Sequence, residues 1–208
     1  MKRCVIIGGA PIEDYAVCRA ELDPEDFIIC CDSGLKHREA LGVTPDLVVG
    51  DFDSHPAPRL DTETITLPRA KDDTDTIYAL RTALKRGFET FLLLGVTGRR
   101  LDHTMANLST LLWLESQGKQ GVILDNWSRI TVVTPGKPGF VEDNWPYFSL
   151  LALEGTARGV TIENAAFPLE QGENGCEYQY AVSNEPLPGG SRITVEQGRL
   201  ILMKIREG

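Results

Sequence analysis

Two aspartates, Asp51 and Asp53, stand directly after a short apolar run, Leu47 to Val49. In extended backbone, residues two apart point to the same side of the chain, so these carboxylates can be aimed at one point. Hard anionic oxygens suit Mg²⁺, which proteins usually hold through one or two carboxylates together with substrate phosphates. An isolated Asp-x-Asp is more often only a solvated turn. The pair is therefore a candidate metal site that needs support from other segments.

A second acidic segment, residues 71–76, stands just before a predicted helix. Asp72 and Asp75 are three residues apart, so they share a face if the helix begins early. Acids near a helix start also serve as caps, which explains one of them. Capping does not explain three acids next to a lysine. We interpret Lys71 as a candidate phosphate contact and the acids as candidate metal ligands.

A third segment, residues 95–103, follows a leucine-rich run and precedes the clearest predicted helix. Its glycines, Gly98 among them, allow close backbone approach, and the helix start offers free N–H groups to an anion. Arg100 is suited to clamp phosphate oxygens through two N–H groups. Asp102 is the expected N-cap, a structural role that can coexist with function. His103 is a weaker candidate, because a first-turn histidine is often structural.

These segments become informative when they are taken together. Four successive predicted strands end in polar loops, the remaining one being Asp32-Ser33-Gly34, and all four loops are expected to meet at one edge of a sheet. Clustered carboxylates repel one another unless a cation neutralises them. A metal–nucleotide site would resolve that repulsion. Seven acids fall at this edge: Asp32, Asp51, Asp53, Asp72, Asp73, Asp75 and Asp102.

The elements that must position these loops alternate between uncharged strands and helices, which predicts a mainly parallel sheet covered on both faces. Strands are expected at residues 5–7, 27–31, 47–49, 91–94 and 122–124, and helices at 16–20, 35–41, 75–86 and 103–117.

The pattern changes after residue 126, where Pro and Gly punctuate short apolar runs and no helix is indicated. This is typical of an antiparallel sandwich or barrel. Strands are expected at 130–133, 147–153, 159–162, 178–182, 192–195 and 200–205. We predict an α/β N-terminal domain, residues 1–125, and an all-β C-terminal domain, residues 126–208.

Composition narrows the function. The chain has 208 residues and a formal net charge of −9. That charge argues against a nucleic-acid or anionic-membrane surface but not against a polyphosphate, because a local cation can reverse the field inside a cleft. No apolar run approaches a membrane span of roughly 20 residues. Five cysteines without a Cys-x-x-Cys pair favour a reducing cytoplasm over disulfides or zinc. Walker, Rossmann, hydrolase-elbow and His-Glu-x-x-His motifs are absent from the sequence.

The ordered set of motifs resembles the thiamine pyrophosphokinase family over nearly the whole chain. The resemblance rests on Asp32-Ser33-Gly34, Pro45-Asp46, Gly50-Asp51-Phe52-Asp53-Ser54, Lys71-Asp72 with Thr74-Asp75, Gly98 to His103 with Asn107, Gly159-Val160-Thr161 with Phe167-Pro168-Leu169, and Ser183-Asn184-Glu185. Two positions depart from the family pattern: Arg99 stands where Gly is usual, and Phe167 stands where Tyr or Trp is usual.

The resemblance implies an ATP-binding α/β domain, a C-terminal β-sandwich, and a homodimer that holds thiamine between the two kinds of domain. It implies that the hydroxyethyl oxygen of thiamine attacks the β-phosphorus of ATP, giving thiamine diphosphate and AMP. On this basis we expect Mg²⁺ on Asp51, Asp53 and Asp75. The residues expected in catalysis are Asp51, Asp53, Asp72, Asp75, Arg100 and Asp102, with Asp102 or Asp72 as proton acceptor. Those expected to bind ATP are Asp32, Ser33, Gly34, Ser54, Lys71, Thr74, Gly98, His103 and Asn107, and those expected to bind thiamine are Ser183 and Asn184.

Two alternatives stay open at this point. A pyrophosphokinase with a pterin alcohol as acceptor would show similar N-terminal acids, although Ser183-Asn184-Glu185 favours thiamine. A non-catalytic nucleotide or thiamine sensor would bind these ligands and release no AMP, although binding alone rarely needs so many acids.

Overall fold

The computed structural model describes residues 2–52, 61–68 and 72–206. The chain forms two compact units, Met1–Asn126 and Trp127–Gly208. Three residues that the sequence assigns to the site, Asp53, Ser54 and Lys71, lie outside the described residues.

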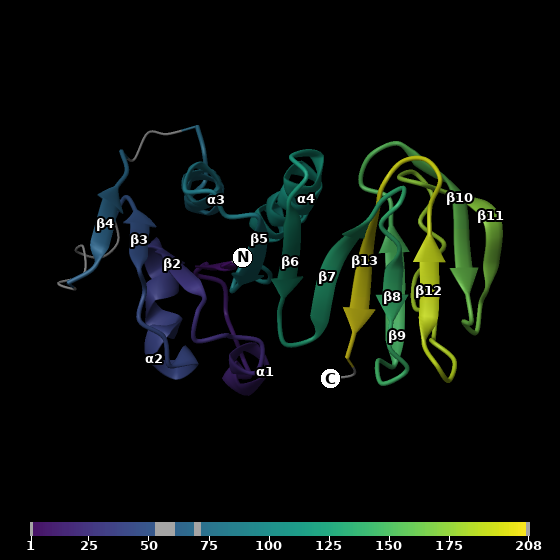
Figure 1. Ribbon diagram of the computed structural model, residues 1–208, viewed down its shortest axis with the longest axis horizontal. Coiled ribbons are helices and arrows are strands. Elements are labelled where there is room, and N and C mark those ends of the chain that lie inside the picture. Colours follow the sequence, from purple (N-terminus) through teal and green to yellow (C-terminus); the bar gives the residue numbers. More distant parts are fainter. Residues whose placement is uncertain (1, 53–60, 69–71, 207–208) are drawn as a thin grey trace. The chain divides into compact units, whose positions relative to one another are not determined.

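The sheet of the first unit is parallel throughout its described pairings. Its strands lie in the order β4-β3-β2-β1-β5-β6 (Figure 1). The register places Ile7 beside both Cys30 and Leu94, so the carboxyl ends of the central strands lie level with one another. The strands are β1 (Cys4–Ile7), β2 (Phe27–Cys31), β3 (Leu47–Gly50), β4 (Glu63–Thr66), β5 (Thr90–Leu94) and β6 (Gln120–Leu124).

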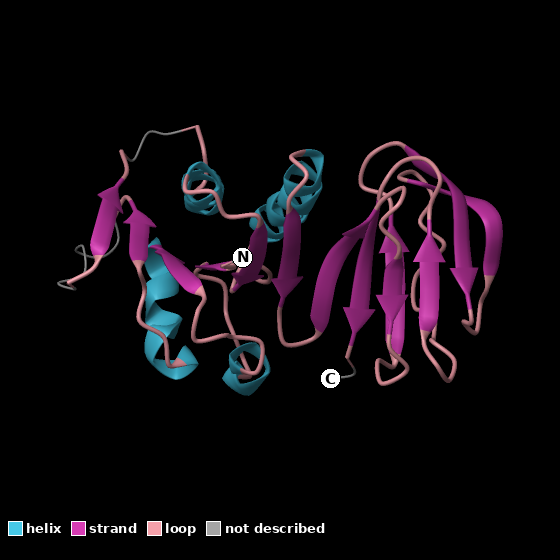
Figure 2. Cartoon of the chain, in the orientation of Figure 1, coloured by secondary structure: helices cyan, strands magenta, loops and turns pink. Residues whose placement is uncertain are grey.

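Helices cover both faces of this sheet, as the uncharged strands predict (Figure 2). Val5 and Ile7 point to one face, where they pack with Cys18 of α1 and Leu41 of α2. On the other face α3 lies against β1, β2 and β3, and α4 lies against β6. The helices are α1 (Tyr15–Arg19), the 3₁₀ helix η1 (Asp32–His37), α2 (Arg38–Leu41), α3 (Asp75–Lys85) and α4 (Leu101–Ser116).

The second unit is built from two antiparallel sheets, ordered β7-β13-β9 and β11-β10-β12-β8. Side chains from both sheets, including Phe148, Leu202, Val160 and Ile193, share one buried core, which makes the unit a β-sandwich. The strands are β7 (Ser128–Val133), β8 (Gly139–Val141), β9 (Tyr147–Leu151), β10 (Thr156–Glu163), β11 (Leu169–Gly175), β12 (Ser191–Thr194) and β13 (Leu200–Ile205).

The fold differs from the prediction at a few elements. The strand predicted at residues 178–182 is wrong: Tyr178 makes only an isolated bridge to Gly175, and the strand in this region is β11. β4 and β8 were not predicted, and the first half of the helix expected at 35–41 belongs to the 3₁₀ helix η1. Among the described residues, no helix combines the length and apolar character that crossing a membrane requires.

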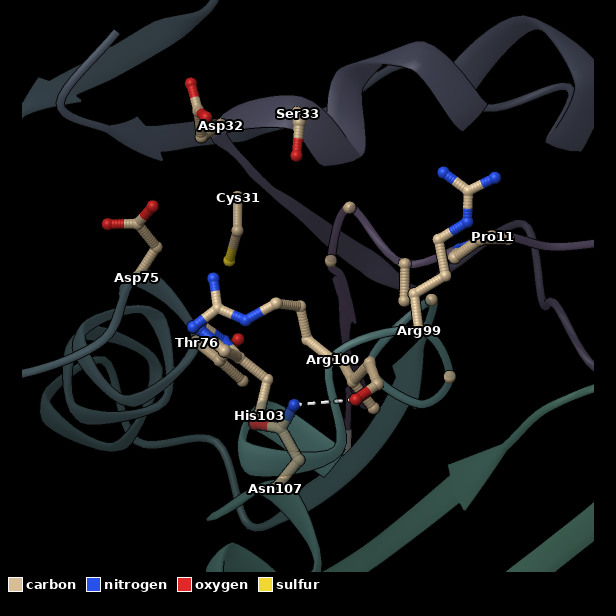
Figure 3. A pocket seen from close by; sticks show the side chains of 16 residues that line it. Pro11, Cys31, Asp32, Ser33, Asp75, Thr76, Arg99, Arg100, His103 and Asn107 are labelled. Atoms are coloured by element: carbon tan, nitrogen blue, oxygen red, sulfur yellow. Dashed lines mark hydrogen bonds between the residues drawn. The ribbon is translucent and has the colours of Figure 1, made fainter. Parts of the chain in front are cut away.

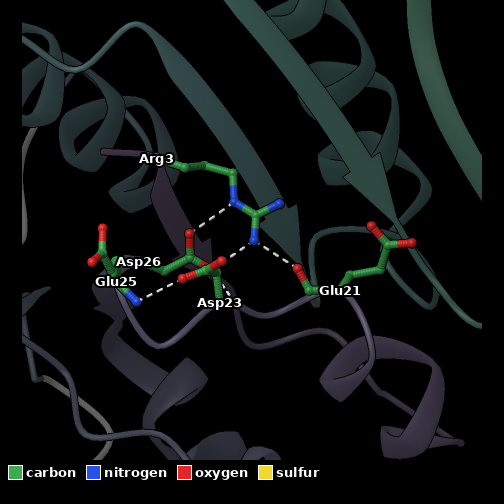
Figure 4. Close-up of polar contacts among 5 residues, drawn as sticks. All are labelled: Arg3, Glu21, Asp23, Glu25 and Asp26. Atoms are coloured by element: carbon green, nitrogen blue, oxygen red, sulfur yellow. Dashed lines mark hydrogen bonds and ion pairs between the residues drawn. The ribbon is translucent and has the colours of Figure 1, made fainter. Parts of the chain in front are cut away.

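A buried ion pair fixes the end of the sheet opposite the strand-end loops. The Arg3 guanidinium donates to both carboxylate oxygens of Asp26, at 2.9 and 2.6 Å, and to the Glu21 carbonyl oxygen (Figure 4). The Asp26 side chain is 2% exposed and also accepts from the Asp23 backbone N–H. The pair therefore anchors the turn that leads into β2.

We expect Asp26→Asn to lower the free energy of unfolding by about 2–3 kcal/mol, because it leaves Arg3 partly buried without its counter-charge. Urea denaturation measures the change. Glu25→Gln, an exposed acid in the same turn, is the matched control and should change stability by less than about 0.5 kcal/mol. Equal small losses in both variants would show that the ion pair does not anchor the turn.

Candidate active site

The strand order reverses beside β1. The chain adds β2, β3 and β4 on one side of β1 and then returns to place β5 on the other side. In open α/β sheets, ligands bind outside the carboxyl ends of the strands at such a switch point. The loops after β1 and β5 therefore mark the expected position of a binding crevice.

A pocket of about 360 Å³ lies at this position (Figure 3). It brings together the loops after β1, β2 and β5 with the first turns of α3 and α4. Its lining residues include the predicted site residues Asp32, Ser33, Asp75, Gly98, Arg100, His103 and Asn107. It also includes Thr76, Gly95, Val96 and Arg99, which belong to the predicted segments 71–76 and 95–103 but were not assigned a role, and residues outside those segments: Gly8, Gly9, Ala10, Pro11 and Cys31.

The loop after β1 is held in place by its backbone. The N–H groups of Gly8 and Ala10 donate to the carbonyls of Leu94 and Gly95, both at 2.8 Å. The Gly9 carbonyl accepts from Lys36 Nζ at 2.5 Å. A Gly-Gly pair directly after the first strand was the only sequence signal for this wall of the pocket.

Buried His37 holds the same loop from the side of η1. Its Nε2 donates to the Ala10 carbonyl at 2.9 Å, and its Nδ1 accepts from the Tyr15 hydroxyl at 2.7 Å. Burial lowers the pKa of His37, and the neutral ring satisfies both contacts. Sequence reasoning gave no role to His37 or to Lys36.

Acidic side chains lie at the β2–β3 side of the pocket. Gly50 makes room for Asp32, because a Cβ atom at Gly50 would lie 2.9 Å from the Asp32 Cβ. Burial, and after it the negative charge of Asp75, raises the pKa of the Cys31 thiol well above its ordinary value. Asp32 and Asp75 both line the pocket, so two of the strand-end loops each bring an acid to it.

Residues in left-handed backbone mark these loops. Among the described non-glycine residues of the first unit, positive φ occurs at Asp32 (34°), Phe52 (50°) and Arg99 (34°), which follow β2, β3 and β5. Such conformations concentrate at functional sites, where the surrounding structure maintains them. The left-handed backbone at Phe52 also corrects the assumption that the chain is extended directly after Asp51.

The residues of the acidic segment before α3 have different contacts. Thr74 caps the helix by accepting from the Ile77 N–H at 3.3 Å. The Asp73 carboxylate pairs with Arg81 at 3.0 Å, and Asp72 is exposed. Asp75 begins the helix and is the acid of this segment that lines the pocket.

At the start of α4 the structure corrects one prediction. The N-cap is Arg100, which makes no side-chain cap hydrogen bond, and Asp102 lies within the first turn. Arg100 donates to both Asp102 carboxylate oxygens, at 3.0 and 2.6 Å. This contact, aided by the His103 backbone N–H, holds the pKa of Asp102 well below its usual range.

Two predicted ATP-binding residues have structural contacts. The Nδ2 of buried Asn107 donates to the Val96 carbonyl at 2.7 Å and ties α4 to the loop after β5. Gly34 is buried where a Cβ atom would lie 2.1 Å from the Ile7 carbonyl oxygen, so glycine there permits η1 to approach β1. Exposed His103 faces the pocket.

The pocket has two acids that could bind a metal ion, Asp32 and Asp75. No group of three or more His, Cys, Asp or Glu side chains close enough to hold a metal occurs among residues 2–52, 61–68 and 72–206. Mg²⁺ commonly takes only one or two protein carboxylates and completes its shell with phosphate oxygens and water. Asp32 and Asp75 both line the pocket, so two carboxylates are available for that kind of binding.

The second unit has a smaller pocket, of about 130 Å³, beside the predicted thiamine-binding residues. Asn184 is 4% exposed; its Oδ1 accepts from the Phe167 and Glu185 N–H groups, and its Nδ2 donates to the Phe167 carbonyl. It thereby fixes the loop that carries Phe167, while Ser183 has φ 57°. The lining is Ile162, Phe167, Pro168, Leu169, Tyr180, Ala181, Val182 and Asn184.

A polar pocket at a switch point, beside a helix start without a side-chain cap, is typical of α/β proteins that bind phosphate-bearing ligands. The catalytic-domain model of the thiamin pyrophosphokinase family matches residues 18–123. This match covers half of the chain and shows that the chain belongs to the thiamine pyrophosphokinase family.

Individual relatives are similar to this chain over 98–100% of their lengths. A thiamine pyrophosphokinase of Bacillus subtilis (strain 168) is 24% identical over 211 residues, which cover 98% of this chain and 99% of the relative. Crystal structures of thiamine pyrophosphokinases from Bacillus subtilis and Geobacillus thermodenitrificans have the same fold, with TM-scores of 0.87 and 0.85 at 23% and 24% identity. They cover 100% and 99% of this chain, and the chain covers 100% and 98% of them.

The lowered pKa of Asp102 leads to a prediction about pH. Its folded pKa lies below its unfolded value of about 3.9, so the ion pair is complete above that pH and is lost only as pH falls further. Asp102→Asn should lower kcat/KM for thiamine diphosphate formation by a constant factor, on the order of tenfold, from pH 5.5 to 9. If kcat/KM of the wild type fell toward the acidic end of this range and that fall were absent in Asp102→Asn, Asp102 would be titrating there, and its lowered pKa would be contradicted.

Proposed function

We propose that this chain transfers the pyrophosphoryl group of ATP to the hydroxyethyl oxygen of thiamine. The bond between that oxygen and the β-phosphorus forms, the bond between the β-phosphorus and the oxygen of the α-phosphate breaks, and AMP leaves. The observation that carries the proposal is the convergence of Asp32, Asp75 and the Gly98–His103 loop on one pocket in a member of the thiamine pyrophosphokinase family.

Asp51, Asp53 and Asp75 are the proposed Mg²⁺ ligands, and Asp72 joins them directly or through water. The position of Asp75 in the lining of the pocket, together with Asp32, supports this arrangement. Bound there, Mg²⁺ would neutralise phosphate charge and relieve the repulsion between the carboxylates. The acids themselves orient the nucleotide by fixing where its phosphate oxygens lie.

Phosphate charge is stabilised by Lys71 and Arg100, and by the N–H groups of the first turn of α4. Two donors of the Arg100 guanidinium contact Asp102, which leaves three of its five for phosphate oxygens. The same ion pair makes Asp102 a weak base. Asp72 is the other proposed acceptor of the thiamine hydroxyl proton. The remaining nucleotide contacts are assigned to Asp32, Ser33, Gly34, Ser54, Thr74, Gly98, His103 and Asn107.

Comparing Asp75→Asn with Asp73→Asn tests whether Asp75 holds the metal or whether removing any nearby acid has the same effect. We expect Asp75→Asn to lower the rate of AMP and thiamine diphosphate formation about 100-fold or more, with folding retained. Asp73→Asn is the matched control, because its carboxylate pairs with Arg81 instead of lining the pocket, and its rate should stay within about threefold of wild type. Near-normal rates for Asp75→Asn would exclude the metal role.

The wild-type assay tests the reaction itself. Pure protein incubated with ATP, Mg²⁺ and thiamine should form thiamine diphosphate and AMP in equal amounts. Product only with a pterin alcohol would identify the other pyrophosphokinase, and binding without AMP release would identify a sensor.

For thiamine we propose the pocket of the second unit, with Ser183 and Asn184 beside it. Phe167 and Tyr180 line this pocket and are 68% and 43% exposed, which leaves their rings accessible to a flat cationic ligand. An exposed apolar rim is also consistent with a homodimer that completes the active site. The odd number of cysteines, each free in this structure, supports a cytoplasmic location.

Phe167→Ala should raise the KM for thiamine about tenfold and leave the KM for ATP unchanged, because it removes a cation–π surface. Steady-state kinetics with each substrate varied in turn measures this. Phe140→Ala removes a half-exposed ring outside the pocket and serves as the control. A change of similar size in the KM for ATP would rule out a thiamine-specific contact.

A further inference from the structure

The two arginines that line the main pocket differ in the hydrogen bonds and ion pairs that their guanidinium groups make. The Arg100 guanidinium is committed in part to Asp102. Arg99 lines the same pocket, and within the described parts of the chain no hydrogen bond or ion pair engages its guanidinium. Arg99 is therefore the pocket arginine whose full set of donors is open to a ligand.

The two side chains also reach different parts of the pocket. In Figure 3 Arg100 extends toward Thr76, whereas Arg99 extends along the opposite wall beside Pro11. The backbone of that wall does not need Arg99, because the Gly9 and Ala10 carbonyls already accept from Lys36 and His37. The guanidinium is thus directed along the pocket wall without serving as a structural contact to it.

The backbone at Arg99 adopts a conformation that is rare for a residue with a side chain. Its φ of 34° lies in the left-handed region, which a long side chain adopts only at a cost in conformational free energy. The surrounding loop maintains this conformation: the Gly98 N–H donates to Thr104 Oγ1 at 3.0 Å, and Thr104 Oγ1 donates to the Arg100 carbonyl at 3.1 Å. The loop therefore presents Arg99 from a fixed base.

We propose that Arg99 is a nucleotide-binding residue that contacts the phosphate chain, in addition to Arg100. A guanidinium without a counter-charge favours a planar anionic partner such as a phosphate oxygen pair. Thiamine is a cation, so it is not the group that Arg99 would contact. This inference rests on the proposed function in placing ATP in the pocket.

The test measures binding and does not need turnover. Arg99→Asn removes the charge but tolerates left-handed backbone, and Arg99→Lys keeps the charge without the paired donors. Isothermal titration of each variant with ATP, inorganic tripolyphosphate and adenosine separates the phosphate chain from the nucleoside. Lys85→Gln is the control, because it removes one exposed positive charge from the end of α3 opposite Asp75.

We expect Arg99→Asn to weaken ATP and tripolyphosphate binding about tenfold, Arg99→Lys to weaken them less, and adenosine binding to stay unchanged. Thermal unfolding of Arg99→Asn should match or exceed wild type, because strain is reduced. Unchanged tripolyphosphate affinity, or an equal loss for adenosine, would overturn the proposal. A wild-type protein that binds these ligands but forms no thiamine diphosphate would instead contradict the proposed function alone.

Discussion

Parallel pairing of β1 with β2 on one side and β5 on the other is the constraint on which the site depends. It brings the ends of three strands level, so that loops far apart in the sequence share one crevice. Two carboxylates, Asp32 and Asp75, line that crevice, where each raises the electrostatic cost of the other. A ligand that carries cations into the pocket would relieve it.

Much of the first unit was predictable because its central strands are apolar on both faces and α3 has apolar residues at helical spacing. β4 was missed because Glu63–Thr66 is an edge strand whose side chains are mostly exposed, so burial imposed little pattern on it. In the second unit the aromatic run around Tyr178 resembled a strand, whereas β11 (Leu169–Gly175) contains polar residues and two glycines. There, pairing with β10 determines the structure more than local propensity does.

The site also contains residues that could be predicted from the sequence and residues that could not. Charged residues at strand ends, such as Asp75 and Arg100, could be assigned to it from sequence because strand direction alone brings them together. Gly8 to Pro11 could not, because uncharged backbone gives no chemical signal until the neighbouring strand is known. The partners of each acid were also hidden: Asp73 pairs with Arg81, and Asp102 with Arg100, for reasons of local geometry that spacing does not reveal.

We propose that the strand-end carboxylates share a metal ion and a triphosphate in the pocket beside β1 and β5. A crystal structure with Mn²⁺ and a non-hydrolysable ATP analogue, recorded at the manganese absorption edge, tests it most directly. We expect an anomalous peak that marks Mn²⁺ between the phosphate chain and carboxylate oxygens of Asp51 or Asp75. The analogue itself should lie against Ser33. A peak or an analogue bound away from this pocket would contradict the account.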